Sequence, residues 1–434
     1  MNSRAGSSRV RNDLHLTDLP NIQLGLSNRK FNIQDIVDSC YTSISKSENK
    51  IRAWEHLIPK SNQPIATQSL PLEGLCIGVK DIFATLDAPT RMGVDDKTWI
   101  GTKGCFDARV ISKVRGSGAI IVGKNKTSEF AVHEPTDTLN PIHDSLSVGT
   151  SSSGSAAAVA ANHVAVSFAS QTAGSIARPA SYCGVIGFKP SFGEIPRTGV
   201  LKTTETFDTV GLIGNSIANI RSVFEVARVS GENHPTHRKR IVYPGKIKQI
   251  RFALGEEFDN ATPFTRDSVI DIIQPYFNDK FEIDFLRNQE QNFQSLREIH
   301  ENIYAKEISY FLAAEMERGN ISTNLRHFLE FGTRIPIERY RTYLELLRVK
   351  KGEWRLDFDS TLVVALSAAD EAPKVGCADK LDSNLFWTAL GLPQVSLPLL
   401  KSKNGFPIGI SLIGPYGSDD YLLDLSENLI SNNS

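Results

Sequence analysis

Two serine-rich turns carry the side chains of this chain that are best suited to nucleophilic chemistry. The first turn, residues 149–155 (GTSSSGS), leads into an alanine-rich stretch that predicts a helix over 155–161. A β-rich run at 165–169 follows the helix and ends in the second turn, residues 172–175. Because one helix and one strand separate the turns, both can meet at one edge of a sheet, where ligand sites tend to form.

The first turn has two open interpretations on its own residues, and two other sequence motifs can be excluded. A flexible linker is the simplest, but the ordered elements on both sides count against it. The free N–H groups and dipole of a helix N-terminus favour an anion, which can be a phosphate or an oxyanion. A phosphate-binding loop at 118–125 (GAIIVGKN) is excluded because Asn125 replaces the required Ser or Thr. A GxSxG nucleophile elbow is excluded because Ser153 replaces the second glycine.

The elements that must position these turns alternate between short apolar strands and helices, which predicts an α/β sheet protein. We expect residues 1–30 to be a flexible N-terminal segment and 31–434 to be a single domain, with a charged helical layer inserted at about 287–355. The expected strands lie at 75–79, 119–122, 165–169, 362–366, 394–397 and 408–413, and the expected helices at 32–46, 109–115, 155–161 and 217–227.

The composition excludes several classes of function. The chain has 434 residues and a net charge of −1, so neither nucleic acid nor an acidic membrane is an expected partner. Five scattered cysteines without a CxxC pair, and nine histidines without HExxH spacing, predict no disulfide framework and no metal site. No apolar run reaches 18 residues. We therefore expect a cytoplasmic protein without a metal or cofactor.

Several ordered motifs together resemble the amidase signature family from about residue 30 to 425. They are Val79–Asp81, the serine turn 149–155, the segment 170–175 (SQTAGS), the segment 183–190 (CGVIGFKP), Gly391–Pro393 and the segment 409–415 (GISLIGP). The resemblance implies an amidase signature fold, with a central mixed β-sheet flanked by helices on both faces.

The resemblance also implies a catalytic set. Lys80 is the base, Ser151 the bridging serine and Ser175 the nucleophile, and the 24 residues from Ser151 to Ser175 fit the family's spacing. The backbone N–H groups of Thr172, Ala173, Gly174 and Ser175 form the oxyanion hole. Thr150 stands in the substrate site where the family usually has glycine, just before the serine that follows a cis peptide.

Lys80 must be uncharged to accept a proton. The usual pKa of a lysine is about 10.4, so a base that works near pH 7 to 8 needs a pKa lower by about 3 units. Burial lowers the pKa of an amine, and the apolar run before Lys80 favours burial. A lysine at the end of an isolated strand would otherwise be a solvated charge.

Two departures from the family pattern resemble a malonamidase-like branch of small-amide hydrolases. Gln171 replaces the common aspartate, and Arg178 stands three residues after Ser175 rather than two. In that branch the arginine binds the substrate's carboxylate, a role that suits the guanidinium fork. A structural ion pair or a capped carbonyl is the alternative for Arg178, and the sequence leaves both open.

We therefore expect an amide hydrolase that cleaves a small carboxamide, including one that bears a carboxylate, to acid and ammonia through an acyl-enzyme. The expected partner is the small-molecule amide substrate, and the resemblance also implies that the protein forms a homodimer. The glutaminase subunit of a tRNA-dependent amidotransferase, which works with a partner chain, is the second interpretation. A non-catalytic binding protein on the same fold is the third.

Overall fold

The computed structural model describes residues 13–433 apart from 64–68, 95–103, 133, 230–246, 256–257, 259–260, 278–280, 287–289, 320 and 378–381. The described strands form one mixed sheet of eleven in the order β1-β3-β2-β4-β6-β5-β10-β11-β9-β7-β8. Strand β2 runs parallel to β3 and β4, and β7 runs parallel to β8 and β9, whereas the other neighbours are antiparallel.

The strands are β1 (Trp54–Leu57), β2 (Cys76–Lys80), β3 (Ile120–Asn125), β4 (Val166–Gln171), β5 (Ile186–Lys189), β6 (Thr209–Gly214), β7 (Gln249–Ala253), β8 (Glu282–Phe285), β9 (Thr361–Leu366), β10 (Gln394–Lys401) and β11 (Pro407–Ile413). The α-helices are α1 (Leu19–Ser27), α2 (Ile33–Ile51), α3 (Arg109–Gly116), α4 (Ser153–Ala160), α5 (Ala177–Cys183), α6 (Ile217–Ala227), α7 (Pro263–Ile273), α8 (Glu290–Phe311), α9 (Ala313–Arg318), α10 (Thr323–Arg334), α11 (Ile337–Asp357), α12 (Asn384–Ala389) and α13 (Asp419–Asn433).

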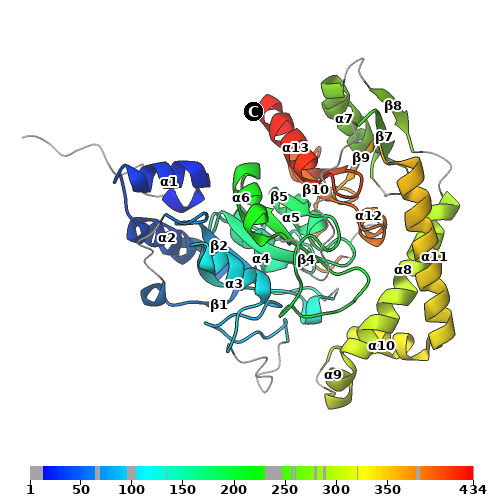
Figure 1. Ribbon diagram of the computed structural model, residues 1–434, viewed down its shortest axis with the longest axis horizontal. Coiled ribbons are helices and arrows are strands. Elements are labelled where there is room, and N and C mark those ends of the chain that lie inside the picture. The colour runs from blue at the N-terminus through cyan, green and yellow to red at the C-terminus, as the bar shows by residue number, and fades with distance from the viewer. Residues whose placement is uncertain are drawn as a thin grey trace, which may run out of the picture.

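Helices cover both faces of the sheet (Figure 1). A Cβ atom on Gly211 of β6 would meet Ile176, next to α5, whereas one on Gly214 would meet Ile220 of α6. Positions three apart on a strand face opposite sides, so α5 and α6 lie on opposite faces. Because both faces are covered, β2, β3, β4 and β6 are buried along their whole length. The predicted mixed α/β sheet is confirmed.

The strands and helices expected from the sequence are present, with ends that differ by a few residues. The strand expected at 75–79 is β2, which includes Lys80 as its last residue. The helix expected at 155–161 is α4, which begins at Ser153 inside the first serine turn. These two shifts matter for the site, because they place Lys80 in the sheet and the serines at a helix N-terminus.

Part of the N-terminal segment, which the sequence predicts to be flexible, has regular secondary structure. Residues 1–12 lie outside the described part, but Leu14–Leu16 form a 3-10 turn and α1 follows it. Leu19 and Ile22 are buried, and the Leu19 N–H donates to Asn219 Oδ1 of α6 at 2.9 Å. The apolar residues of this short helix bury against the body of the protein, and that contact orders it.

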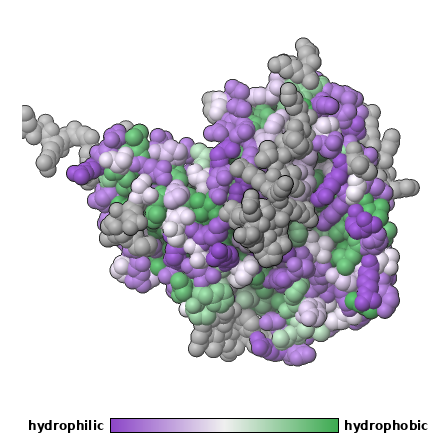
Figure 2. Space-filling model, in the orientation of Figure 1, coloured by the Kyte–Doolittle hydropathy of each residue, from purple (hydrophilic) through white to green (hydrophobic). Residues whose placement is uncertain are grey.

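The helical stretch expected at 287–355 contains α8 to α11, which stand along one side of the molecule in Figure 1. Buried residues of α8, α10 and α11 share an apolar core with Phe386 and Trp387 of α12. The face drawn in Figure 2 mixes hydrophilic and hydrophobic residues over both this side and the α1–α3 side. Among the described residues, no helix is long and apolar enough to cross a membrane.

Candidate active site

Lys80 ends β2 in the middle of the β3-β2-β4 unit, and its side chain is fully buried. Its amine donates to three serine hydroxyls, to Ser151 Oγ at 2.8 Å, Ser152 Oγ at 3.0 Å and Ser170 Oγ at 3.0 Å. No carboxylate is within ion-pair distance of this amine among the described residues. Lys80 is therefore a buried amine held by neutral groups.

Burial lowers the pKa of Lys80 to about 7, and the negative charge of Asp208 partly opposes this change. Desolvation disfavours the charged form of an amine, and hydroxyl partners do not compensate as a carboxylate would. The pKa decrease that the sequence analysis required is thus present. Near neutral pH, a substantial fraction of Lys80 is uncharged and has a lone pair that can accept a proton.

The first serine turn reaches Lys80 through the segment that precedes α4. Gly149 has φ +82°, and a Cβ atom there would come within 3.2 Å of Pro179 in α5. The peptide bond between Thr150 and Ser151 is cis. The Ser151 carbonyl accepts hydrogen bonds from Thr127 Oγ1 at 3.0 Å and from the Ser128 N–H at 3.3 Å. These contacts fix Ser151 between β3 and α5.

The second turn presents backbone N–H groups without partners. From Thr172 to Ser175, no backbone N–H donates to another residue of the described chain. Thr172 and Ala173 are half-buried, and Gly174 and Ser175 are buried. Because buried N–H groups are usually paired, four successive groups without a protein partner can receive an oxyanion. A Cβ atom on Gly174 would lie 2.9 Å from Nη2 of Arg178. The turn therefore packs closely against α5.

The side chain of Gln171 stabilises this turn through hydrogen bonds. Its Oε1 accepts from the N–H groups of Ile176 at 2.9 Å and Ala177 at 3.1 Å, which are first-turn donors of α5. Its Nε2 donates to Thr388 Oγ1 at 3.0 Å, and Thr388 in turn donates to the Ala173 carbonyl at 2.7 Å. The sequence showed Gln171 only as a departure from the family pattern, and its structural role as a cap was missed.

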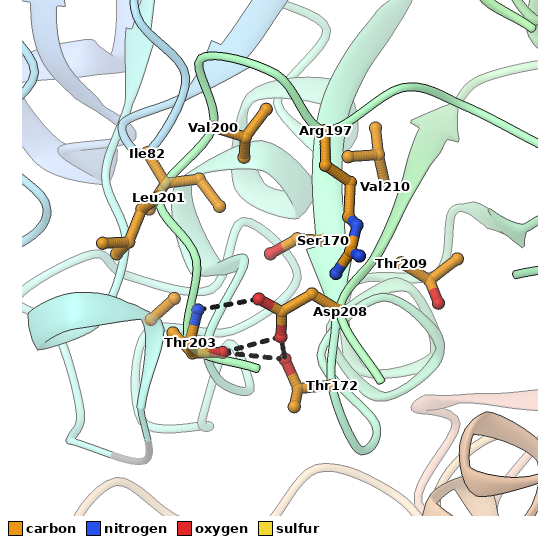
Figure 3. Close-up of a pocket in the computed structure, with 11 residues that line it drawn as sticks. Ile82, Ser170, Thr172, Arg197, Val200, Leu201, Thr203, Asp208, Thr209 and Val210 are labelled. Atoms are coloured by element: carbon orange, nitrogen blue, oxygen red, sulfur yellow. Dashed lines mark hydrogen bonds between the residues drawn. The ribbon is translucent and has the colours of Figure 1, made fainter. Parts of the chain in front are cut away.

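Asp208 joins the second turn to the loop before β6. It accepts from Thr172 Oγ1 at 2.7 Å, and both the N–H and the hydroxyl of Thr203 and of Thr204 donate to it. The carboxylate lines a cavity of about 10 Å³ together with Ser170 (Figure 3). That volume is about the size of one water molecule. Asp208 thus stabilises Thr172 and lies close enough to Lys80 to affect its pKa.

Ser175 lies at the end of the second turn, just before α5, and its residue surface is 8% exposed. Its hydroxyl makes no hydrogen bond to a residue of the described chain. The structure therefore brings Lys80 and Ser151 into contact, but the hydrogen bond from Ser175 to Ser151 is not formed. Hydrogen bonds of a catalytic set are often completed only when substrate is bound.

Arg178 is held by a carboxylate of the protein. Its Nε lies 2.7 Å from Asp382 Oδ2, and both side chains are almost fully buried. The Asp382 Oδ1 also accepts from the N–H of Asn384 at 3.1 Å. Nη2 of the same guanidinium is close to Gly174, one residue from Ser175. The structural pair that the sequence left open is present, and it places the guanidinium beside the oxyanion turn.

Sequence reasoning missed three groups that contact the site. Ser152 and Ser170 share Lys80 with Ser151, and His300 of α8 hydrogen-bonds through Nε2 to the Thr172 carbonyl at 2.8 Å. Ser152 was one of three consecutive serines and could not be distinguished from its neighbours. Only the fold shows that α8, more than 120 residues after the turn, packs against it. Thr150 makes no side-chain hydrogen bond within the described chain.

The Amidase family model matches residues 35–263, which is more than half of the chain. The chain belongs to the amidase family. Proteins of this family hydrolyse amide C–N bonds, and this chain is such an enzyme.

The related sequences and structures come from several kinds of amide-processing protein. A glutamyl-tRNA(Gln) amidotransferase subunit of Brachyspira hyodysenteriae is 27% identical over 92% of this chain and 96% of its own length. The chloroplastic/mitochondrial form of that subunit in Oryza sativa is 33% identical, but over 44% of this chain and 38% of its own. Peptide amidase from Stenotrophomonas maltophilia superposes with a TM-score of 0.80 at 18% identity, covering 96% of this chain and 97% of that one.

A second solved structure, 6-aminohexanoate cyclic dimer hydrolase, superposes with a TM-score of 0.81 at 18% identity, again covering 96% and 97% of the two chains. At such identities the likeness of this amidase-family chain to both structures establishes the fold. The substrate has to be argued from the site itself.

Proposed function

We propose that this enzyme hydrolyses the carboxamide of a small molecule, including one that bears a carboxylate, to the acid and ammonia. The observation that carries the proposal is the buried Lys80 amine, with a pKa of about 7, in contact with Ser151 Oγ beside a turn of free N–H groups. Lys80 is the base in this proposal, Ser151 relays the proton and Ser175 is the nucleophile.

The neutral form of Lys80 has two N–H groups and one lone pair. With the N–H groups donated to Ser152 and Ser170, the lone pair faces the hydroxyl of Ser151. Ser151 then gives its proton to Lys80 and takes one from Ser175, while Ser175 Oγ forms a bond to the amide carbon. The carbonyl π electrons move to the oxygen, which lies against the N–H groups of the 172–175 turn.

Collapse of this intermediate breaks the C–N bond. The proton on Lys80 returns through Ser151 to the leaving nitrogen, so ammonia departs and an ester to Ser175 remains. Water then attacks the ester carbon and gives one proton through Ser151 to Lys80. Collapse of this second intermediate breaks the bond to Ser175 Oγ, which takes the proton back from Lys80 through Ser151, and the acid is released. The proton and the electron pairs balance at each step, and no cofactor is required.

Arg178 suits a role in binding the carboxylate of such a substrate. Asp382 holds the guanidinium through Nε, while Nη2 lies against Gly174 next to the nucleophile. Arginine binds carboxylates through a planar set of donors, which also fixes their orientation. A guanidinium already held in place needs little reorganisation to bind substrate.

We expect Arg178→Ala to raise KM for carboxylate-bearing amides by about 10- to 100-fold, while KM for neutral amides of the same size changes less than about threefold. Initial rates over a matched set of acid and neutral amides measure this difference. Arg178→Lys, which keeps the charge but loses the fork, should give an intermediate value. Equal losses for both substrate sets would assign Arg178 to the Asp382 pair alone.

The proposed function is tested by ammonia release from small mono- and dicarboxylic amides, together with labelling by a fluorophosphonate. We expect turnover of at least one amide and covalent labelling located at Ser175 by peptide mass. Both results require an activated serine. A folded protein that releases no ammonia and resists the label would instead be a non-catalytic binding protein.

A second candidate function is the glutaminase subunit of an amidotransferase. It is favoured by the Brachyspira relative, which aligns over nearly the whole of both chains. In this case the chain would copurify with other subunits, and glutamine would be hydrolysed faster in the complex than by the chain alone. Full activity on small amides without other subunits supports the first proposal, and a species of two copies of this chain supports the homodimer.

A further inference from the structure

Three successive carbonyl groups of the second turn accept hydrogen bonds from three different helices. The Thr172 carbonyl accepts from Nε2 of His300 in α8 at 2.8 Å, and the Ala173 carbonyl accepts from Thr388 Oγ1 in α12 at 2.7 Å. The Gly174 carbonyl accepts from a backbone N–H of α5 at 3.0 Å. Each peptide group of the turn is thus held by its oxygen.

These hydrogen bonds fix the direction of the N–H group that follows each carbonyl. A peptide group is planar, and in its trans form the N–H points away from the C=O. The cis peptide bond of the described chain is Thr150–Ser151, outside this turn. The N–H groups of Ala173, Gly174 and Ser175 therefore point away from the three helices that hold the carbonyls. They are among the N–H groups that receive the oxyanion in the proposed mechanism.

The same hydrogen bonds make these N–H groups stronger donors, because a carbonyl that accepts a proton polarises its whole peptide group. Since a carbonyl oxygen can only accept, Nε2 of His300 carries the proton. The single proton of Thr388 Oγ1 has a nearer acceptor in the Ala173 carbonyl, at 2.7 Å, than in the Asn384 carbonyl, at 3.0 Å. Thr388 Oγ1 also accepts from Gln171 Nε2, and hydrogen bonds that act in a chain reinforce one another.

The packing of α8 restricts the position of His300. Its residue surface is 2% exposed, and its ring stacks on Phe207 with the ring centroids 4.4 Å apart. Glu307 lies two turns further along the same face of the helix, and its Oε2 accepts from the N–H groups of Glu205 at 2.8 Å and Thr206 at 3.1 Å. This face of α8 therefore contacts both the second turn and the loop before β6.

We propose that His300 and Thr388 are positioning residues, which aim the N–H groups of Ala173 and Gly174 at the oxyanion of the tetrahedral intermediate. The inference rests on the proposed function, in which Ser175 attacks the amide carbon beside this turn. Both side chains act through the backbone of the turn. Negative charge develops on the carbonyl oxygen of the substrate only during attack, so loss of either hydrogen bond should slow the reaction without weakening substrate binding.

The test for His300 compares a variant that loses the donor with one that keeps it. His300→Phe keeps an aromatic ring to stack on Phe207 and loses the N–H, whereas His300→Gln keeps an N–H donor of similar reach. We expect His300→Phe to lower kcat, and the rate constant for fluorophosphonate labelling of Ser175, by about 10- to 100-fold, with KM within about threefold of wild type. His300→Gln should bring both rates back to within about fivefold of wild type.

Thr388→Val and Thr388→Ser form the matched pair for the next peptide group. Valine has the shape of threonine without the hydroxyl and should cause a loss of about the same size, whereas serine keeps the hydroxyl and should stay within about threefold of wild type. This pair tests the proposal even if His300→Phe does not fold, which thermal melting reveals. Glu307→Gln is the control for the packing of α8, because Glu307 contacts the loop and not the turn, and it should label within about threefold of the wild-type rate.

For either residue, three results overturn the proposal. They are labelling of Ser175 at the wild-type rate by the variant without the donor, a loss confined to KM, and an equal loss in the variant that keeps the donor. A loss of rate in Glu307→Gln equal to that in His300→Phe, at the same melting temperature, would show that the effect arises from loosened packing. Absence of both wild-type turnover and Ser175 labelling would instead refute the proposed function.

Discussion

Replacing Ser175 with alanine is expected to lower kcat/KM for the best amide substrate by at least about 10⁴-fold. The proposed mechanism forms a bond between Ser175 Oγ and the amide carbon, and alanine has no atom that can replace it. Ser175 hydrogen-bonds to no described residue, so its removal should hardly affect the free energy of unfolding. Ammonia release and urea unfolding of the same preparation measure both effects.

Ser431→Ala is a matched control, since Ser431 is an exposed serine of α13 whose hydroxyl donates to the Glu427 carbonyl. It should retain wild-type activity and should still be labelled by the fluorophosphonate at Ser175. Turnover by Ser175→Ala within about tenfold of wild type would remove Ser175 as the nucleophile. In that case, labelling of Ser151 or Ser152 would identify another serine in its place.

Lys80→Met is expected to lower kcat/KM by about 10² to 10⁴-fold, because methionine cannot accept the proton that Ser151 passes on. In the wild type, the pKa of Lys80 is about 7. Activity should therefore rise with pH up to about 7 and level off above it, as the neutral amine becomes predominant. The remaining activity of Lys80→Met should not show this rise with pH, which is the acid limb of the wild-type profile.

Lys80→Met is also expected to change how the free energy of unfolding depends on pH. The pKa of Lys80 is 10.5 in the unfolded chain and about 7 in the folded protein, so between these values the unfolded state binds more protons. The stability of the wild type must then increase with pH across this window. From pH 7 to pH 9, wild type should gain about 2 kcal/mol relative to Lys80→Met, as measured by urea unfolding.

Lys189→Met is the control, because Lys189 is a second fully buried lysine with a pKa lowered to about 7 by burial. Its amine donates to the carbonyls of Leu392 and Pro190, away from the serines. Its replacement should give a similar pH-dependent difference in stability without changing the acid limb of kcat/KM. An unchanged acid limb in Lys80→Met would show that another group is the base.

The predicted strands and helices were found because their patterns depend on neighbouring residues. The apolar run at 75–79 predicted β2, and the alanine-rich stretch predicted α4 to within two residues at its start. The 3-10 turn and the helix α1 that begin at Leu14 and Leu19 were not predicted from the sequence. The apolar residues of this segment are few, and their burial depends on a contact with α6, some 200 residues later in the chain.

The sequence predicted the residues of the site that lie in local motifs, but not the distant residues that contact them. Lys80, Ser151 and Ser175 lie in motifs that match the family position by position, and the structure places the first two in contact. The partners that hold them come from distant segments. Thr388 supports Ala173, His300 contacts Thr172, and Asp382 pairs with Arg178. No local pattern reveals such pairs, because they arise only when α8 and α12 pack against the second turn.

The sequence by itself determined the family, the mixed sheet and the residue types available for hydrolysis, because these depend on motif order and on local periodicity. Only the tertiary structure decided the charge state of those residues. A lysine at a strand end is an ordinary cation in water. In the proposed mechanism, Lys80 acts as a base because the sheet excludes water from it and three serine hydroxyls surround it. Desolvation is a property of the packed molecule.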